Sequence, residues 1–172
     1  MWKLAGFWLR DLTLSVLIAL VVILFLYQPV RVEGTSMMPN LQDQERLFIN
    51  KFVYKLGLGE VDRFDTVVFW FPGDPSKSYI KRVIGMPGDV VEVRSGFVFL
   101  NGKLLDEPYV PPEYRDQMST APLKVPPGHY YVMGDHRSSS NDSRNWGPVA
   151  REAIYGKAVF AYWPPARLGP VP

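Results

Sequence analysis

The sequence predicts a mostly β, antiparallel, barrel-like domain that follows one N-terminal transmembrane helix. Three observations lead to this prediction. Residues 12–30 carry no charge and are mostly Leu, Val and Ile. Later stretches rich in β-branched and aromatic residues alternate with tight turns, and the 16 prolines and 14 glycines favour turns over long helices. We therefore expect a cytoplasmic tip and membrane anchor in residues 1–30 and an extracytoplasmic β-rich domain in residues 31–172.

The apolar segment fits a membrane span better than two alternatives. At roughly 1.5 Å per residue, residues 12–30 extend over the thickness of a hydrocarbon core. A buried core helix would show a polar stripe, which this run lacks. A cleavable leader would end at a small-x-small site, whereas this run leads into residues 27–31 (YQPVR). Lys3 and Arg10 precede the run and favour a cytoplasmic N-terminus.

The rest of the chain is predicted to form strands joined by turns. The β-prone stretches are residues 47–54, 66–71, 90–94, 97–100, and two near 130–133 and 154–163. The pairs Ser95-Gly96 and Asn101-Gly102 indicate tight hairpin turns. Residues 106–128 carry six prolines and little periodicity, so we expect a loop or a small excursion there. The Pro-rich tail after Trp163 is expected to form a surface strap.

Composition excludes several classes of function. The chain has no cysteine, which rules out disulfides, a thiolate nucleophile and cysteine-based metal sites. With only His129 and His136, the sequence argues against a multi-histidine metal site, and we expect neither metal nor cofactor. The net charge of +2 comes from scattered Lys and Arg residues, which argues against a nucleic-acid surface.

Ser36 is a candidate nucleophile. It lies in residues 34–41 (GTSMMPNL), a few residues beyond the apolar run and so at the outer rim of the expected bilayer. Gly34 permits close approach of the backbone, and Pro39 stiffens the exit from the loop. Serine is a weak nucleophile near neutral pH and needs a base and donors for the oxyanion. Taken alone, such a loop is more often a turn whose serine bonds its own backbone.

Lys81 is a candidate base. If residues 78–84 form a strand, Tyr79, Lys81 and Val83 share one face. Burial disfavours the charged ammonium and lowers the pKa of a lysine, so a buried Lys81 would be neutral near physiological pH and accept the serine proton. The alternative is a solvated lysine on an exposed strand face, the commoner situation for this residue type.

A third segment, residues 134–147 (GDHRSSSNDSRNWG), is dense in hydroxyls and charges. Such a segment is suited to orienting another group by hydrogen bonds, although an exposed polar loop would have the same composition. His136 also admits a Ser-His-Asp triad, because triads are defined by geometry and not by order along the chain. The triad is the less favoured hypothesis, since no partner that would orient His136 is identifiable.

Four segments, in order and after an N-terminal anchor, resemble the signature blocks of bacterial type I signal peptidase. They are residues 34–39, residues 46–54, residues 79–82 with 85–89, and residues 134–147. The resemblance covers most of the chain beyond the anchor. It implies a Ser-Lys dyad protease with a mostly β catalytic fold. It also implies a membrane-bound serine endopeptidase that removes N-terminal signal peptides from secreted preproteins after small-x-small (Ala-x-Ala-like) sites.

The resemblance also implies roles for individual residues. Ser36 aligns with the nucleophile, Lys81 with the general base, and Ser140 with a hydroxyl that positions the lysine amine, while Asp142 and Arg144 match a supporting ion pair. By the same likeness, the shallow pockets for small substrate side chains would be lined by Val30, Val32, Met37, Leu41, Tyr79 and Ile80. The expected partners are preproteins and the lipid bilayer of the bacterial cytoplasmic membrane, with a monomer favoured.

Two positions depart from the family pattern. Gly34 stands where some members carry a serine that helps to hold the oxyanion, and His136 stands where asparagine is common. Two other classes remain open at this point. One is a Ser-Lys peptidase with narrower substrates, such as a dedicated maturation enzyme or a self-cleaving regulator. The other is a catalytically silent, membrane-tethered β module that binds exported chains.

Overall fold

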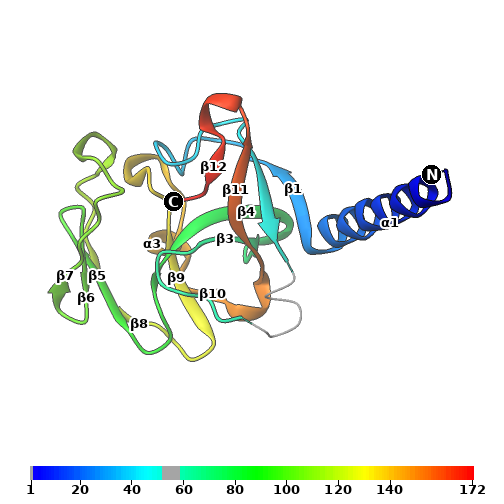
Figure 1. Ribbon diagram of the computed structural model, residues 1–172. Helices are drawn as coiled ribbons and strands as arrows, with labels where there is room; N and C mark the ends of the chain where they lie inside the picture. The colour runs from blue at the N-terminus through cyan, green and yellow to red at the C-terminus, as the bar shows by residue number, and fades with distance from the viewer. Residues whose placement is uncertain (1, 52–58) are drawn as a thin grey trace.

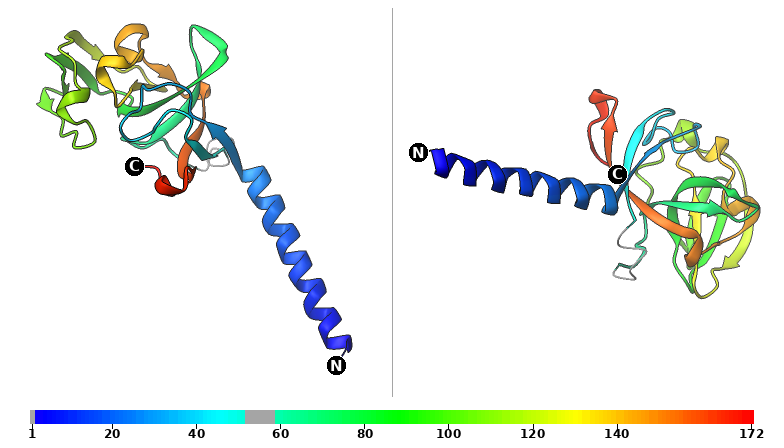
Figure 2. Two further views of the ribbon diagram at one scale, coloured as in Figure 1. Left: turned by 90° about the horizontal axis from the view of Figure 1, so that it is seen from above. Right: turned by 90° about the vertical axis from the view of Figure 1, so that its right-hand side faces the viewer.

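The chain forms one long N-terminal helix that projects from a body of strands (Figures 1 and 2). The computed structural model describes residues 2–51 and 59–172. Helix α1 spans Trp2–Leu26. Seven aliphatic side chains of this helix between residues 12 and 21 are 49–63% exposed. In the part of the chain that the structure describes, no helix was found with both the length and the hydropathy to cross a membrane. The membrane span therefore stays a prediction.

The larger of two antiparallel sheets carries eight strands. They are β1 (Tyr27–Arg31), β2 (Arg46–Asn50), β3 (Thr66–Phe71), β4 (Asp74–Gly85), β9 (His129–Met133), β10 (Val149–Ala150), β11 (Ile154–Trp163) and β12 (Gly169–Pro170). Their order is β1-β2-β11-β3-β4-β9-β10, with β12 paired to β11. Among the described residues no pairing joins β1 to β10, so the sheet is an open path. Pro29, which has no N–H to donate, lies in the edge strand β1.

The smaller sheet carries four strands and lies at the end of the molecule away from α1 (Figure 1). They are β5 (Val90–Arg94), β6 (Phe97–Leu100), β7 (Lys103–Leu104) and β8 (Thr120–Lys124), in the order β7-β6-β5-β8. The two predicted hairpin turns are confirmed. Ser95 and Gly96, and again Asn101 and Gly102, all have positive φ, as a two-residue hairpin turn of this type requires.

Five short helical turns complete the described residues. They are η1 (Pro112–Tyr114), η2 (Arg137–Ser139), α3 (Ser143–Trp146), η3 (Arg151–Ala153) and η4 (Pro165–Arg167). Two of them, η2 and α3, follow β9 directly. They fold the polar segment 134–147 back over the end of that strand.

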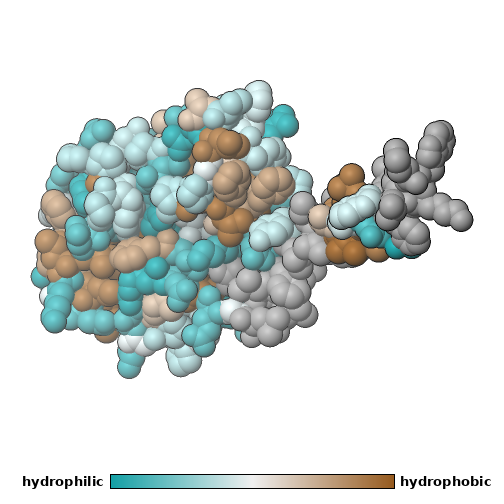
Figure 3. Space-filling model, in the orientation of Figure 1, coloured by the Kyte–Doolittle hydropathy of each residue, from teal (hydrophilic) through white to brown (hydrophobic). Residues whose placement is uncertain are grey.

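The buried side chains form three hydrophobic clusters. Phe69 and Val83 belong to a cluster between β3, β4 and β9, Leu47 and Ile49 to one under β1 and β11, and Val91 to one that joins the two sheets. Apolar groups are also exposed in the view of Figure 3, over the β11–β12 side and over the small sheet. The candidate residues Ser36 and Lys81 lie on the loop after β1 and on β4.

The predicted mostly β, antiparallel architecture is confirmed, with two local differences. Helix α1 ends at Leu26, and the expected anchor boundary at residue 30 falls inside β1, which pairs with β2. The Pro-rich region 106–128 contains strand β8, because pairing with β5 supplies the order that its local pattern lacks. The strand expected over residues 47–54 is β2, and residues 52–54 lie outside the described residues.

Candidate active site

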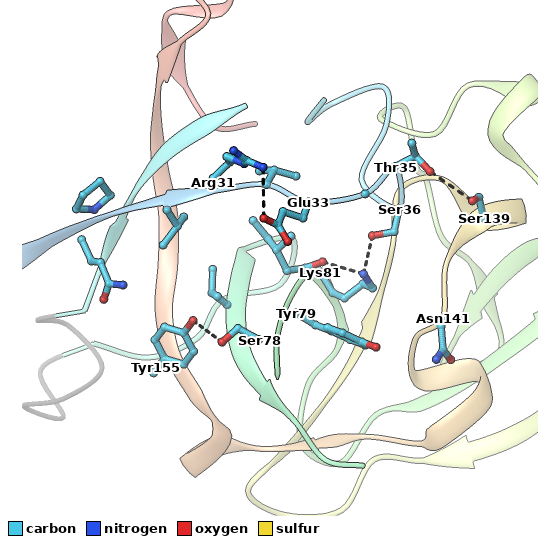
Figure 4. A pocket seen from close by; sticks show the side chains of 17 residues that line it. Arg31, Glu33, Thr35, Ser36, Ser78, Tyr79, Lys81, Ser139, Asn141 and Tyr155 are labelled. Carbon is cyan, nitrogen blue, oxygen red and sulfur yellow. Dashed lines mark hydrogen bonds and ion pairs between the residues drawn. The ribbon is translucent and has the colours of Figure 1, made fainter. Parts of the chain in front are cut away.

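Ser36 lies in a loop between β1 and β2 that is fixed by core packing and by a hydrogen bond within the loop. Met37 and Leu41 are each 1% exposed and insert into the core. The Gly34 N–H donates to the Asp43 carboxylate over 2.8 Å. Gly34 has φ of +96°, a conformation that strains any residue with a side chain. These contacts turn the half-buried Ser36 toward the space in front of β4 (Figure 4).

Lys81 is buried on β4 and meets the serine. Its side chain is 4% exposed, and its Nζ lies 2.7 Å from Ser36 Oγ and 3.0 Å from the Ile80 carbonyl oxygen. Burial lowers the pKa of Lys81 to about 8, against the opposing pull of the Asp142 and Asp135 carboxylates. The Ser36 hydroxyl thus lies next to the Lys81 amine, and this amine can be neutral near physiological pH.

Asp142 is the centre of a buried network beside this pair. Arg144 binds both of its carboxylate oxygens over 2.8 Å, and the Gly134 N–H donates to it over 3.0 Å. The Ser140 hydroxyl also donates to Asp142, over 2.7 Å. The ion pair implied by the resemblance is therefore formed. Between Ser140 and Lys81, however, the described residues show no hydrogen bond, and the Ser140 hydroxyl donates to the Asp142 carboxylate instead.

Gly134 allows the polar segment to approach the nucleophile. A methyl group added at this position would overlap both Ser140 Oγ and the Ser36 carbonyl oxygen. The N–H of His136, two residues further along, donates to that same carbonyl over 3.0 Å. Only a glycine fits at this contact, which joins the loop after β1 to the loop after β9.

The structure does not form the Ser-His-Asp triad considered from the sequence. The His136 ring lies with Nδ1 3.2 Å from the Thr35 carbonyl oxygen, and it makes an edge contact with the ring of Tyr114. Ser36 Oγ is bonded instead to Lys81, and no described contact joins it to the imidazole. His136 holds the backbone of the loop and does not act on the serine hydroxyl.

A second set of buried ion pairs was missed by reasoning from the sequence. Arg82 binds Asp135 through two hydrogen bonds of 2.9 and 2.7 Å, and the two side chains are 3% and 0% exposed. Arg137 pairs in the same way with the buried Glu107. Arg82 follows Lys81 in the sequence, and Asp135 precedes His136. Their positions inside these two motifs are a signal that could have identified them. Glu107, in the Pro-rich region, has no such signal.

A cavity of about 690 Å³ lies in front of Ser36 and Lys81 (Figure 4). Four of the six residues expected to form substrate pockets line it: Val30, Val32, Tyr79 and Ile80. Met37 and Leu41 are not among its lining residues. They belong to the core cluster that also contains Val32, so they lie under the cavity and support its wall.

Several lining residues are polar and were not singled out from the sequence. They are Arg31, Glu33, Ser78, Asn141 and Tyr155. The Tyr155 hydroxyl donates to Ser78 Oγ over 2.9 Å, and Arg31 and Glu33 pair over 3.6 Å. Strands β1 and β4 therefore give the cavity both apolar and polar lining residues.

Comparisons with known proteins point to one family. A family model described as signal peptidase, peptidase S26, matches residues 6–163. Signal peptidase I of Bacillus amyloliquefaciens is 41% identical over 167 residues, which cover 91% of this chain and 84% of that protein. Signal peptidase I T of Bacillus subtilis (strain 168) is 40% identical over the same shares. A crystal structure of a signal peptidase I from Enterococcus faecalis V583 is 32% identical, with a TM-score of 0.50, and covers 58% of this chain and 97% of that one.

Proposed function

Because the chain belongs to the signal peptidase family, peptidase S26, we propose that it removes signal peptides with Ser36 as nucleophile and Lys81 as general base. Family membership makes the chain a serine endopeptidase and confirms the resemblance of the four segments. The observation that carries the residue assignment is the 2.7 Å between Ser36 Oγ and Lys81 Nζ. Burial of the amine supplies the lowered pKa that a base requires.

The proposed reaction uses groups that already touch. A preprotein lies extended in the cavity, neutral Lys81 takes the Ser36 proton, and Oγ attacks the scissile carbonyl carbon. The Ser36 N–H holds the resulting oxyanion. The Lys81 ammonium then gives its proton to the leaving amine as the carbon–nitrogen bond breaks. Water, deprotonated by Lys81, hydrolyses the remaining ester and restores the serine.

The cavity supports a preference for small side chains on the substrate. Val30, Val32 and Ile80 line the same cavity as Ser36 and Lys81, and such an apolar wall would take short apolar groups of a substrate. Met37 and Leu41 support this wall from the core. We therefore propose cleavage after Ala-x-Ala-like sites of secreted preproteins.

The network around Asp142 is proposed to position the base. The Asp142–Arg144 pair is buried and fixes Ser140 through the hydrogen bond of 2.7 Å. With its proton committed to Asp142, the Ser140 hydroxyl presents only lone pairs to other donors. These lone pairs would accept from the Lys81 ammonium when it forms during the reaction.

Helix α1 is proposed to anchor the enzyme in the bacterial cytoplasmic membrane, with the β domain on the outer side. The helix projects free of the sheets in Figure 2 and exposes aliphatic groups, a surface that water disfavours. Cell fractionation tests the proposal. The full chain is expected in the membrane fraction after alkaline washing, whereas a chain lacking residues 2–26 is expected to be released. Release of both chains would contradict it.

The pH dependence of cleavage tests the dyad. Only the neutral form of Lys81 accepts a proton, and its pKa is lowered to about 8. We expect kcat/KM for a preprotein with an Ala-x-Ala site to rise with pH, to reach half its maximum near pH 8, and to level off above it. A lysine at its ordinary pKa would shift the midpoint above about pH 10. A midpoint there would contradict the assignment of a buried base.

Substitutions of Ser36 and Lys81 also test the proposed dyad. Ser36→Ala and Lys81→Ala are each expected to lower the rate by about 10³-fold or more. Ser119→Ala and Lys103→Ala replace an exposed serine and an exposed lysine of the small-sheet region and should leave the rate unchanged. Full activity of Ser36→Ala would reject the nucleophile, and a wild type that cleaves no preprotein would favour a binding module.

A further inference from the structure

The His136 side chain holds the peptide group that carries the Ser36 N–H. Its Nδ1 lies 3.2 Å from the Thr35 carbonyl oxygen. A carbonyl oxygen only accepts, so Nδ1 is the donor in this contact. The Met38 N–H donates to the same oxygen over 3.1 Å. Two donors therefore fix the direction of the Thr35 carbonyl.

The direction of this carbonyl determines the direction of the Ser36 N–H. The cis peptide bonds in the described residues are Met38-Pro39 and Trp163-Pro164, so the Thr35-Ser36 bond is trans. In a trans peptide the C=O and the N–H point to opposite sides. Donors that hold the Thr35 oxygen on one side therefore hold the Ser36 N–H on the other. Within the described part of the chain, this N–H has no hydrogen-bond partner, and Ser36 lines the cavity.

His136 also binds the peptide group that follows Ser36. Its main-chain N–H donates to the Ser36 carbonyl oxygen over 3.0 Å. One residue thus binds the carbonyls on both sides of the Ser36 N–H. The ring is itself supported by Tyr114 at the end of η1, in an edge contact with centroids 4.8 Å apart and planes at 78°.

We propose that His136 is a positioning residue for the oxyanion hole, an inference that rests on the proposed Ser36–Lys81 function. It keeps the Ser36 N–H pointed into the cavity before substrate binds. A hydrogen bond to the Thr35 oxygen also polarises the peptide group and strengthens its N–H as a donor. Gly34 contributes no side-chain donor to the hole, so the Ser36 N–H carries more of the stabilisation in this chain.

Kinetics of His136→Ala separate this role from a structural one. We expect kcat for a preprotein to fall by about tenfold, less than for loss of a whole oxyanion donor, because the Met38 N–H still holds the Thr35 oxygen. KM should change little. Affinity for a peptide aldehyde ending in alanine, which forms a tetrahedral adduct with Ser36, should fall by the same factor as kcat. The pH midpoint of kcat/KM should stay where it is in the wild type.

Two further variants at this position make the result specific. His136→Asn places an amide donor near the position of Nδ1 and is expected to restore kcat and aldehyde affinity. His136→Phe keeps the ring contact with Tyr114 but carries no donor, so it should be as slow as His136→Ala. Because the ring contact is preserved, the Phe variant gives the answer if His136→Ala fails to fold.

His129 provides the matched control. Its Nδ1 also contacts a carbonyl oxygen, that of Pro127 over 2.9 Å, but Pro127 lies outside the loop that carries Ser36. His129→Ala should behave as the wild type in every assay. If His136→Phe has the kcat and aldehyde affinity of the wild type while Ser36→Ala is inactive, the role of His136 is overturned and the proposed function stands. An active Ser36→Ala would overturn the proposed function instead.

Discussion

Replacing Lys81 by methionine is expected to raise the free energy of unfolding near neutral pH while it abolishes cleavage. Lys81 is 4% exposed, and burial lowers its pKa from 10.5 to about 8. Below about pH 8 the folded protein therefore holds an ammonium group that has lost most of its water. The pKa difference corresponds to about 3 kcal/mol of destabilisation. Methionine has a similar shape and no charge, so it fits the same space without this penalty.

The effect is expected to depend on pH in a defined direction. An unfolded lysine keeps its proton up to its ordinary pKa, whereas the folded Lys81 loses it above about pH 8. Between these values the unfolded state binds more protons, so the stability of the wild type rises with pH. The advantage of Lys81→Met should shrink by about 3 kcal/mol as the pH passes from about 8 to above about 10.

Urea unfolding of the full chain in detergent, followed at several pH values, measures this difference. Lys103→Met is the control, because Lys103 is exposed on β7 and its replacement should give a pH-independent result. A stability difference between wild type and Lys81→Met that stays constant across the range would contradict a lowered pKa for Lys81. If the expected trend is found, the buried position that lowers the pKa of Lys81 costs the protein stability, as is common for active sites.

Ser36 and Lys81 could be singled out as candidates from the sequence, but the geometry between them could not. Ser36 and Lys81 lie in short motifs whose order along the chain is visible without a structure. The 2.7 Å contact between them joins positions 45 residues apart and depends on where β1 and β4 lie in the sheet. Met37 and Leu41 illustrate the same limit. The family resemblance placed both among the pocket-lining residues, but only the packing shows that they point into the core.

Long-range pairing explains the other differences. Strand β8 is ordered by β5, and the proline-rich composition around it predicts a loop. The hairpins of the small sheet were predictable because a two-residue turn is a local signal. The Arg82–Asp135 pair joins positions 53 residues apart, and charged residues in a motif give no indication of burial. Elements stabilised by neighbours in sequence were thus recovered, and contacts between distant segments were not.

Asp135→Asn is expected to lower the free energy of unfolding by about 3–5 kcal/mol, because it leaves the buried Arg82 guanidinium without its counter-charge. Asp135 is 0% exposed and Arg82 3% exposed, and the hydrogen bonds between them are 2.9 and 2.7 Å long. Asn40 donates to the same carboxylate over 2.8 Å. The loss should be measured by urea unfolding of the full chain.

Two comparisons identify the cause of that loss. Asp74→Asn removes a carboxylate that pairs with Lys77 at the exposed start of β4, and it should leave stability nearly unchanged. Arg82→Met combined with Asp135→Leu removes both buried charges and should recover part of the loss, since no ion is left unpaired. Equal stabilities of Asp135→Asn and the wild type would show that the pair is dispensable.

The position of this pair makes the loss relevant to the active site. Arg82 follows Lys81 on β4, and Asp135 precedes His136, which contacts the loop of Ser36. A loosened pair would separate the strand of the base from the segment that holds the nucleophile. We therefore expect residual cleavage by Asp135→Asn to fall even at temperatures where the variant stays folded, because the Ser36–Lys81 contact tolerates little displacement. Normal kcat in the folded variant would confine the role of the pair to stability.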